Sequence, residues 1–133
     1  MWTGSDSSYD FSNINTNFTL TSEKNYATNG DYSIKVTSSS NGYNDLGLYQ
    51  CTVQSNETYN VVVDIYNPSS TQVSLRLIEV ESNKFNDISI PYSGNIQSIR
   101  LSRTVTSNST LRCYLIIREP TTVYVDNFCV VKV

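Results

Sequence analysis

The 133-residue sequence contains no histidine and only three cysteines, Cys51, Cys113 and Cys129. Without histidine, and without two cysteines at Cys-x-x-Cys spacing, the chain has no recognisable zinc or iron site. The same absence removes the side chain that most often acts as a general base near neutral pH. All three cysteines fall inside apparent strands, so we interpret them as small buried hydrophobic residues with at most one disulfide among them.

Charged residues are also scarce. They make up 16% of the chain, the net charge is -3, and no run of Lys or Arg occurs. Proteins that bind nucleic acid usually show clustered basic residues, so this composition argues against that class of partner. No apolar stretch approaches the roughly 20 residues of a membrane-spanning helix, and the first residues lack the features of a signal peptide. We therefore expect no nucleic-acid partner and no membrane insertion.

Uncharged polar residues take the place of charge: the chain has 20 Ser, 14 Thr and 15 Asn. Such a surface suits a β-protein in an extracellular or cell-surface setting better than a cytoplasmic enzyme. Met1 and Trp2 followed by a polar run look like the start of an excised piece. We therefore expect a larger parent protein with other domains.

Hydrophobic residues alternate with polar ones along most of the chain, and no segment shows a convincing helical period. In residues 110–118, for example, Leu111, Cys113 and Leu115 alternate with Arg112 and Tyr114. Clusters of Asn, Gly, Pro and Ser separate such segments, as expected of turns. The pattern predicts strands at residues 16–20, 32–38, 46–53, 59–66, 72–80, 85–90, 97–104, 110–118 and from 122 to the end.

About nine short strands separated by turns are typical of an all-β fold, a two-sheet antiparallel β-sandwich. We expect one such domain over residues 16–133, preceded by an extended N-terminal segment at 1–15. An immunoglobulin-like sandwich is the rival architecture. Against it, the sequence lacks the Cys, Trp, Cys order of that fold, and its only Trp is at position 2.

Four short motifs occur in an order that resembles a known family. Asn17-Phe18-Thr19 opens a first strand, residues 29–36 (NGDYSIKV) open the next, residues 58–61 (TYNV) begin a central strand, and residues 123–128 (VYVDNF) close the domain. This order resembles the galactose-binding-like carbohydrate-binding modules of glycoside hydrolases and cell-surface adhesins. The resemblance spans about residues 17 to 131 and implies a jelly roll.

The resemblance also implies a structural Ca²⁺ ion. Many of these modules hold calcium with an acid after the first-strand Phe, carbonyls around the Gly before the second strand, and the Asp of the closing strand. Asp126 matches that last position, and Asn29 to Asp31 match the Gly turn. Thr19 stands where the family usually has Glu. Since calcium takes roughly six to eight oxygens, with carboxylates prominent, the implied site is weakened, completed by water, or lost.

The residues themselves leave a second interpretation of Asp126 open. A carboxylate among the valines of a buried strand is costly unless it is paired or hydrogen-bonded. Asp126 can meet that need by capping backbone amides or by pairing with a nearby Lys or Arg, without any metal.

A sugar site needs an aromatic plane and a few polar partners. Arg112, Tyr114 and Arg118 occupy even positions of one predicted strand, which places them on one face, with about 7 Å between residues 112 and 114 and about 13 Å between 114 and 118. Together with Arg76 on another strand they could bind an acidic or amidated sugar, or simply form a solvated face with salt bridges. Tyr43 and Tyr49, which flank an Asn-Gly loop, are the alternative site, with packing at the edge of the sandwich as the other interpretation.

We therefore predict a non-catalytic carbohydrate-binding or adhesion module of a larger extracellular or cell-surface protein. The alternative is a structural spacer or protein-interaction domain of an adhesin, stalk or viral fibre, without a sugar ligand. A glycosidase would need two facing carboxylates, for which Glu79 with Asp64 or Glu119 are the only candidates we identify. The fold by itself cannot separate a binder from a spacer, because function depends on the site.

Overall fold

The computed structural model describes residues 18–23, 26, 28, 33–39, 44–69 and 72–133. Among these residues there are nine strands and no helix, and therefore no helix long and apolar enough to cross a membrane. The predicted extended segment at 1–15 lies outside the described residues. The strands are β1 (Phe18–Glu23), β2 (Ser33–Ser38), β3 (Asn44–Val53), β4 (Thr58–Tyr66), β5 (Val73–Glu79), β6 (Lys84–Ile90), β7 (Gln97–Thr104), β8 (Ser109–Ile117) and β9 (Thr121–Lys132).

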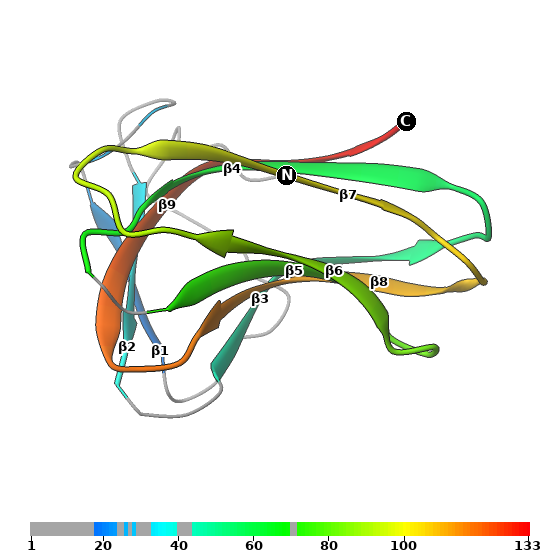
Figure 1. The fold of residues 1–133 in the computed structure, drawn as a ribbon, viewed down its shortest axis with the longest axis horizontal. Coiled ribbons are helices and arrows are strands. Elements are labelled where there is room, and N and C mark those ends of the chain that lie inside the picture. The colour runs from blue at the N-terminus through cyan, green and yellow to red at the C-terminus, as the bar shows by residue number, and fades with distance from the viewer. Residues whose placement is uncertain (1–17, 24–25, 27, 29–32, 40–43, 70–71) are drawn as a thin grey trace.

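The nine strands form two antiparallel sheets that stack face to face (Figure 1). One sheet has five strands in the order β1-β2-β9-β4-β7, and the other has four in the order β3-β8-β5-β6. Only β1 with β2 and β5 with β6 are sequence neighbours that also pair, so the other connections cross between the sheets. This arrangement confirms the predicted all-β, two-sheet antiparallel jelly roll of about nine strands.

The core lies between the sheets and is built by the alternation seen in the sequence. On β8 the predicted inward residues Leu111, Cys113 and Leu115 are at most 2% exposed. They belong to the same core as the inward residues Val61 and Val63 of β4, which are fully buried. Successive side chains of a strand point to opposite faces, so the residues between them necessarily point away from the core.

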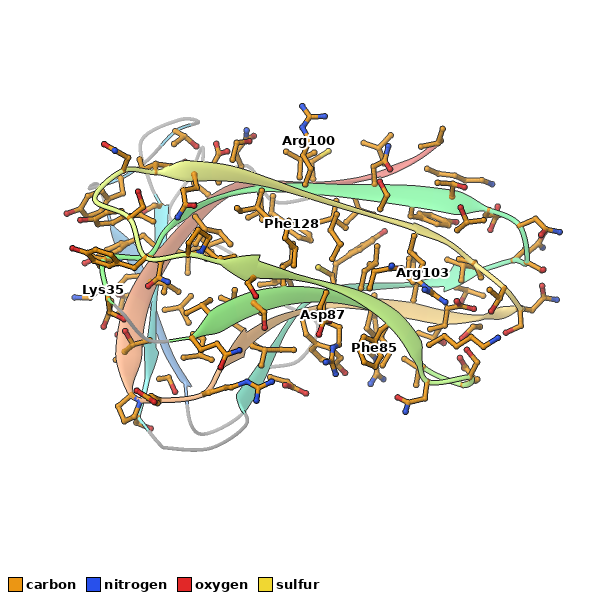
Figure 2. All side chains as sticks on the ribbon, in the orientation of Figure 1. Lys35, Phe85, Asp87, Arg100, Arg103 and Phe128 are labelled. Carbon is orange, nitrogen blue, oxygen red and sulfur yellow. The ribbon has the colours of Figure 1, made fainter. Side chains whose placement is uncertain are left out.

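One buried ion pair joins the two sheets. Glu79 of β5 is fully buried, and its Oε2 accepts a 2.7 Å hydrogen bond from Nε of Arg103 on β7. Its Oε1 accepts a 3.0 Å bond from the backbone N–H of Thr106. Arg103 also donates to Oδ1 of Asn86 at 2.8 Å, and Figure 2 shows it between the two layers. Every charged atom of this pair is therefore matched, as burial requires.

Two bulges reverse the alternation at places that matter for the sites. In β3 the pairing with β8 shifts between Gly47 and Tyr49, and between β4 and β9 it shifts between Val62 and Asp64. Asn127 lies beside the second shift with φ 52°, a conformation that Asn tolerates better than most residues. An extra residue in one strand turns the following side chains to the other face.

Candidate functional site

The outward-pointing residues of the four-stranded sheet form the first candidate site. Because the strands are in register, these residues lie in rows across the sheet. One row contains Gly47, Tyr114, Arg76 and Asp87, and the next contains Gln50, Arg112, Ile78 and Phe85. Figure 2 shows Phe85 and Asp87 on the side of this sheet that faces away from the core. We call Gln50, Arg76, Phe85, Asp87, Arg112 and Tyr114 the polar-aromatic face.

Arg76 of β5 is held by its neighbours on β6. Its Nε and Nη2 donate to the two carboxylate oxygens of Asp87, both at 2.7 Å. Its guanidinium carbon lies 3.8 Å from the centre of the Phe85 ring, a cation–π contact. Phe85 nevertheless remains 43% exposed. The result is an immobilised aromatic ring beside a neutralised guanidinium.

Arg112 of β8 is held by neutral partners instead. Its Nε donates to Oε1 of Gln50 on β3 at 3.0 Å, and its Nη1 donates to the Tyr114 hydroxyl at 3.1 Å. Arg112 and Tyr114 are both half-buried. Because both ends of the guanidinium are anchored, its orientation is fixed while its charge is not neutralised by these bonds.

Asp45 of β3 lies at the end of the same face, opposite Ile116 of β8. Burial raises the pKa of the Asp45 carboxyl above its usual value, while the nearby Arg76 guanidinium lowers it and Asp87 raises it further. The Asp45 carboxyl group therefore interacts electrostatically with the charged residues of the polar-aromatic face.

The structure brings together three of the predicted sugar-binding residues, Arg76, Arg112 and Tyr114. Arg118 follows the end of β8 and is exposed, outside the hydrogen-bonded rows. Tyr49 lies on the inner side, where it packs on the core and meets Phe128 edge-on at 6.4 Å between ring centres. The bulge after Gly47 explains this direction. Tyr43 lies outside the described residues.

Sequence reasoning missed Gln50, Phe85 and Asp87. The sequence did carry a signal for β6. Residues 85, 87 and 89 are alternate positions of a predicted strand, and as a set they do not have the apolar character of a core-facing row. For Gln50, the β3 bulge hides the signal, since it reverses which positions of the strand face outward.

A second cluster lies on the outer side of the five-stranded sheet, around Asp126. Asp126 of β9 is only 1% exposed and pairs in register with Asp64 of β4. Its Oδ2 accepts a hydrogen bond from the backbone N–H of Thr28, at 2.5 Å. The Thr28 hydroxyl lies 2.6 Å from Oδ2 of Asp64 and 3.3 Å from that of Asp126. Oδ1 of Asp126 accepts from the backbone N–H of Asn127 at 2.7 Å.

These contacts explain how the strand accommodates an acid. Thr28 belongs to the connection between β1 and β2, so Asp126 ties that connection to the outer side of the sheet. Tyr26 in the same connection stacks on Tyr66 of β4, with ring centres 4.1 Å apart, and lies 4.6 Å from the Tyr124 ring. The capping of backbone amides considered from the sequence is therefore present.

The other predicted calcium ligands cannot be compared with this cluster. Asn29 and Asp31 lie outside the described residues. Thr19 lies in β1 opposite Thr37 of β2, and its side chain is also outside what the structure describes. Within the described part of the chain, no three His, Cys, Asp or Glu side chains gather as a metal site.

The sequence matches no protein-family model and no curated protein. Solved structures do match. The CBM22-1 xylan-binding domain of Paenibacillus barcinonensis Xyn10C aligns with a TM-score of 0.77 over 99% of this chain and 92% of that one, at 10% identity. The fold is that of carbohydrate-binding modules.

Two further carbohydrate-binding-module matches are structures with sugars bound. TmCBM61 in complex with β-1,4-galactotriose matches at a TM-score of 0.62 and 10% identity, over 86% of this chain and 82% of that chain. The CBM22-1–GH10 modules of Clostridium thermocellum xylanase 10B, complexed with xylohexaose, match at a TM-score of 0.66 and 13% identity. The match covers 98% of this chain and 27% of that chain. At such low sequence identities, the similarity shows that the fold is shared.

Proposed function

We propose that this chain is a non-catalytic carbohydrate-binding module and that its glycan site is the polar-aromatic face. The observation that carries the proposal is the fixed, partly exposed set of an aromatic ring, a phenol and a guanidinium on one face: Phe85, Tyr114 and Arg112. A sugar offers an apolar ring face and a rim of hydroxyls, which such a set can stack on and hydrogen-bond. The glycan-bound proteins of the same fold support the proposal.

The positions of the carboxylates considered for hydrolysis support a non-catalytic role. Glu119 is exposed in the connection between β8 and β9, whereas Glu79 is buried. Glu79 is enclosed between the sheets with its oxygens bonded to Arg103 and Thr106. Asp64 lies on the outer side of the other sheet, beside Asp126. These two acids do not face each other across a shared space, as the general acid and its partner must in a glycosidase.

A glycan array with the 133-residue chain tests the proposal. We expect binding to a polysaccharide of the kind the matched modules bind, such as xylan or β-1,4-linked galactose oligomers. Phe85→Ala and Tyr114→Ala should each lower the affinity about tenfold or more, because aromatic residues usually dominate a binding surface. Tyr92→Ala is the matched control, since Tyr92 is 64% exposed and lies in the β6–β7 connection. Silence of the wild-type chain across the array would overturn the proposal.

The alternative function is a structural spacer or protein-interaction domain without a sugar ligand. The Arg76–Asp87 pair favours it, because two charges that neutralise each other need no ligand. For this alternative, the array would stay silent and the variants at Phe85, Tyr114 and Arg112 would behave as wild type in every assay.

The proposed setting is a larger extracellular or cell-surface protein, as the uncharged polar composition suggests. Secretion with a reporter domain fused to each end, followed by recovery of folded, glycan-binding chain from the medium, would test it.

We also propose a structural Ca²⁺ ion at the Asp126 cluster. Asp64 and Asp126 place two carboxylates beside one hydroxyl, and carboxylate and hydroxyl oxygens are the donors that calcium takes. Asp64, Asp126 and Thr28 would therefore hold the ion. Bound calcium should raise the melting temperature and a chelator lower it. Identical melting curves, with no metal by elemental analysis, would contradict this.

A further inference from the structure

The arginines of the polar-aromatic face differ in how their charge is balanced. Arg76 is bonded through Nε and Nη2 to both oxygens of Asp87, the geometry in which a guanidinium and a carboxylate neutralise each other. Its flat side is also occupied, since it lies over the Phe85 ring. Arg76 is therefore poorly suited to bind a second anion.

Arg112 has no such partner. Its bonds go to an amide oxygen of Gln50 and to the Tyr114 hydroxyl, and the ion pairs of the described residues do not include it. Nη2 and one N–H of Nη1 donate to no described residue. A guanidinium with N–H groups left over can donate them to an oxyanion, for which its planar geometry is well suited.

Three acids lie on or beside the face. The Glu81 carboxylate accepts a 2.7 Å hydrogen bond from the backbone N–H of Thr110, two residues along β8 from Arg112, and so is engaged by the backbone. Asp87 is engaged by Arg76. Asp45 pairs with Ile116, four residues along β8 from Arg112, which corresponds to about 13 Å. That separation exceeds the screening length of about 8 Å at physiological ionic strength. None of these three carboxylates forms an ion pair with Arg112 among the described residues, so the charge of this guanidinium stays unpaired on the face.

An aromatic contact lies in the same row. Arg112 and Phe85 both pair with Ile78, so they are two strands apart, about 10 Å. This distance is wider than a single pyranose ring. A chain of sugars lying across the sheet would place one residue on Phe85 and a neighbouring residue at Arg112.

We infer that the glycan is acidic and that a uronic acid carboxylate binds end-on to Arg112 while a neighbouring sugar stacks on Phe85. This inference rests on the proposed function and names its substrate class. The planar fork of Arg112 matches a carboxylate better than a hydroxyl, and a neutral sugar would leave the positive charge unmatched.

The test compares two forms of one polymer. Binding of the 133-residue chain is measured by isothermal titration calorimetry to a uronic-acid-substituted xylan and to the same xylan after its carboxyl groups are reduced to alcohols. We expect the acidic form to bind at least about tenfold more tightly, as a charge-assisted hydrogen bond would produce. Arg112→Gln should remove this difference, because the acidic polymer should lose at least about tenfold more affinity than the reduced polymer does.

Arg100→Gln is the matched control, because Arg100 is exposed on the outer side of the five-stranded sheet (Figure 2). It removes the same charge from the opposite side of the molecule, so the preference for the acidic polymer should persist. Asp87→Asn should strengthen binding of the acidic polymer several-fold, because it releases the guanidinium of Arg76. Circular dichroism and thermal melting of each variant show that it is folded.

The outcomes separate the two proposals. Binding of neither polymer by the wild-type chain would overturn the proposed function and this inference with it. Equal affinity for both polymers, lowered by Phe85→Ala, would leave the proposed function standing and overturn the inference. A preference for a sulfated polymer over the uronic acid form, abolished by Arg112→Gln, would also overturn it, since the anion would then not be a carboxylate.

Discussion

The outer sides of the two sheets carry the same kinds of residues, and their surroundings differ. On the five-stranded sheet, Asp126 and Tyr66 lie beneath Thr28 and Tyr26 of the connection after β1. On the four-stranded sheet, Phe85 remains 43% exposed, and Arg76, which lies over its ring, belongs to the sheet itself. An outward acid or aromatic therefore does not indicate a binding site by itself, because another segment of the chain can occupy it.

The difference predicts a separation of roles. We call the outer side of the five-stranded sheet, over which Thr28 and Tyr26 lie, the covered side. Its residues should contribute to stability and leave glycan binding unchanged. Residues of the polar-aromatic face should contribute to glycan binding and have little effect on stability. The Glu79–Arg103 pair between the sheets serves as the internal reference for stability, since it is enclosed by both layers.

Removal of the buried acid should have the largest effect on stability. Glu79→Ala leaves the Arg103 guanidinium without its partner between the sheets, which should cost about 3 kcal/mol or more of unfolding free energy in urea denaturation. A double replacement, Glu79→Leu with Arg103→Met, should recover much of that loss because neither charge then stays buried. If Glu79→Ala were as stable as wild type, the pair would not hold the layers together.

The same pair should make stability depend on pH. Burial by itself would raise the pKa of Glu79, but the hydrogen bonds from Thr106 and the Arg103 guanidinium hold that pKa below its usual value. A lowered folded-state pKa stabilises the fold above the ordinary Glu value of about 4.3. The stabilisation is lost as pH falls through the folded-state pKa. Denaturation series at decreasing pH should show a steeper loss for wild type than for Glu79→Gln.

On the covered side, Asp126→Ala should cost about 2 kcal/mol, because the backbone N–H groups of Thr28 and Asn127 lose a charged acceptor. The affinity for glycan should not change. Asp126→Asn is the graded control, since it keeps an oxygen acceptor without the charge, and its loss should be smaller. A drop in glycan affinity for Asp126→Ala at a temperature where it is folded would contradict the separation of the two sides.

Tyr66→Leu should cost about 1 kcal/mol, the value typical of a stacked aromatic pair, because Tyr26 loses the ring on which it packs. Thermal unfolding measures it, with Tyr92→Leu as the exposed control, whose stability should stay within about 0.5 kcal/mol of wild type. Equal losses in the two variants would show that the stacked ring of Tyr26 adds nothing to the fold.

The smallest effect on stability should come from a substitution on the polar-aromatic face. Asp87→Ala breaks an ion pair whose side chains are 18% and 34% exposed, so the unfolding free energy should fall by about 1 kcal/mol or less. A loss comparable to that of Glu79→Ala would mean that the Arg76–Asp87 pair is structural, which would favour the spacer function over the binder.

The sequence by itself determined that the chain forms nine strands, with bounds a few residues off in places such as β1, and determined the inward residues of strands with clear alternation. Side chains alternate at a period of two in any strand, so the inward set of Leu111, Cys113 and Leu115 is a local property of residues 110–118. Arg112 and Tyr114 follow as neighbours on the opposite face for the same reason. These parts of the candidate site needed no knowledge of pairing partners.

Only the tertiary structure decided which outward residues meet and which are covered. The contact of Arg76 with Asp87 depends on the register of β5 with β6, and Tyr49 turns inward because of a bulge that no local pattern marks. Asp126 is buried by Thr28, 98 residues away in the chain. Period-two alternation gives the direction of a side chain, but its partners depend on pairing and coverage by distant segments, which is why the acid in VYVDNF fastens a loop.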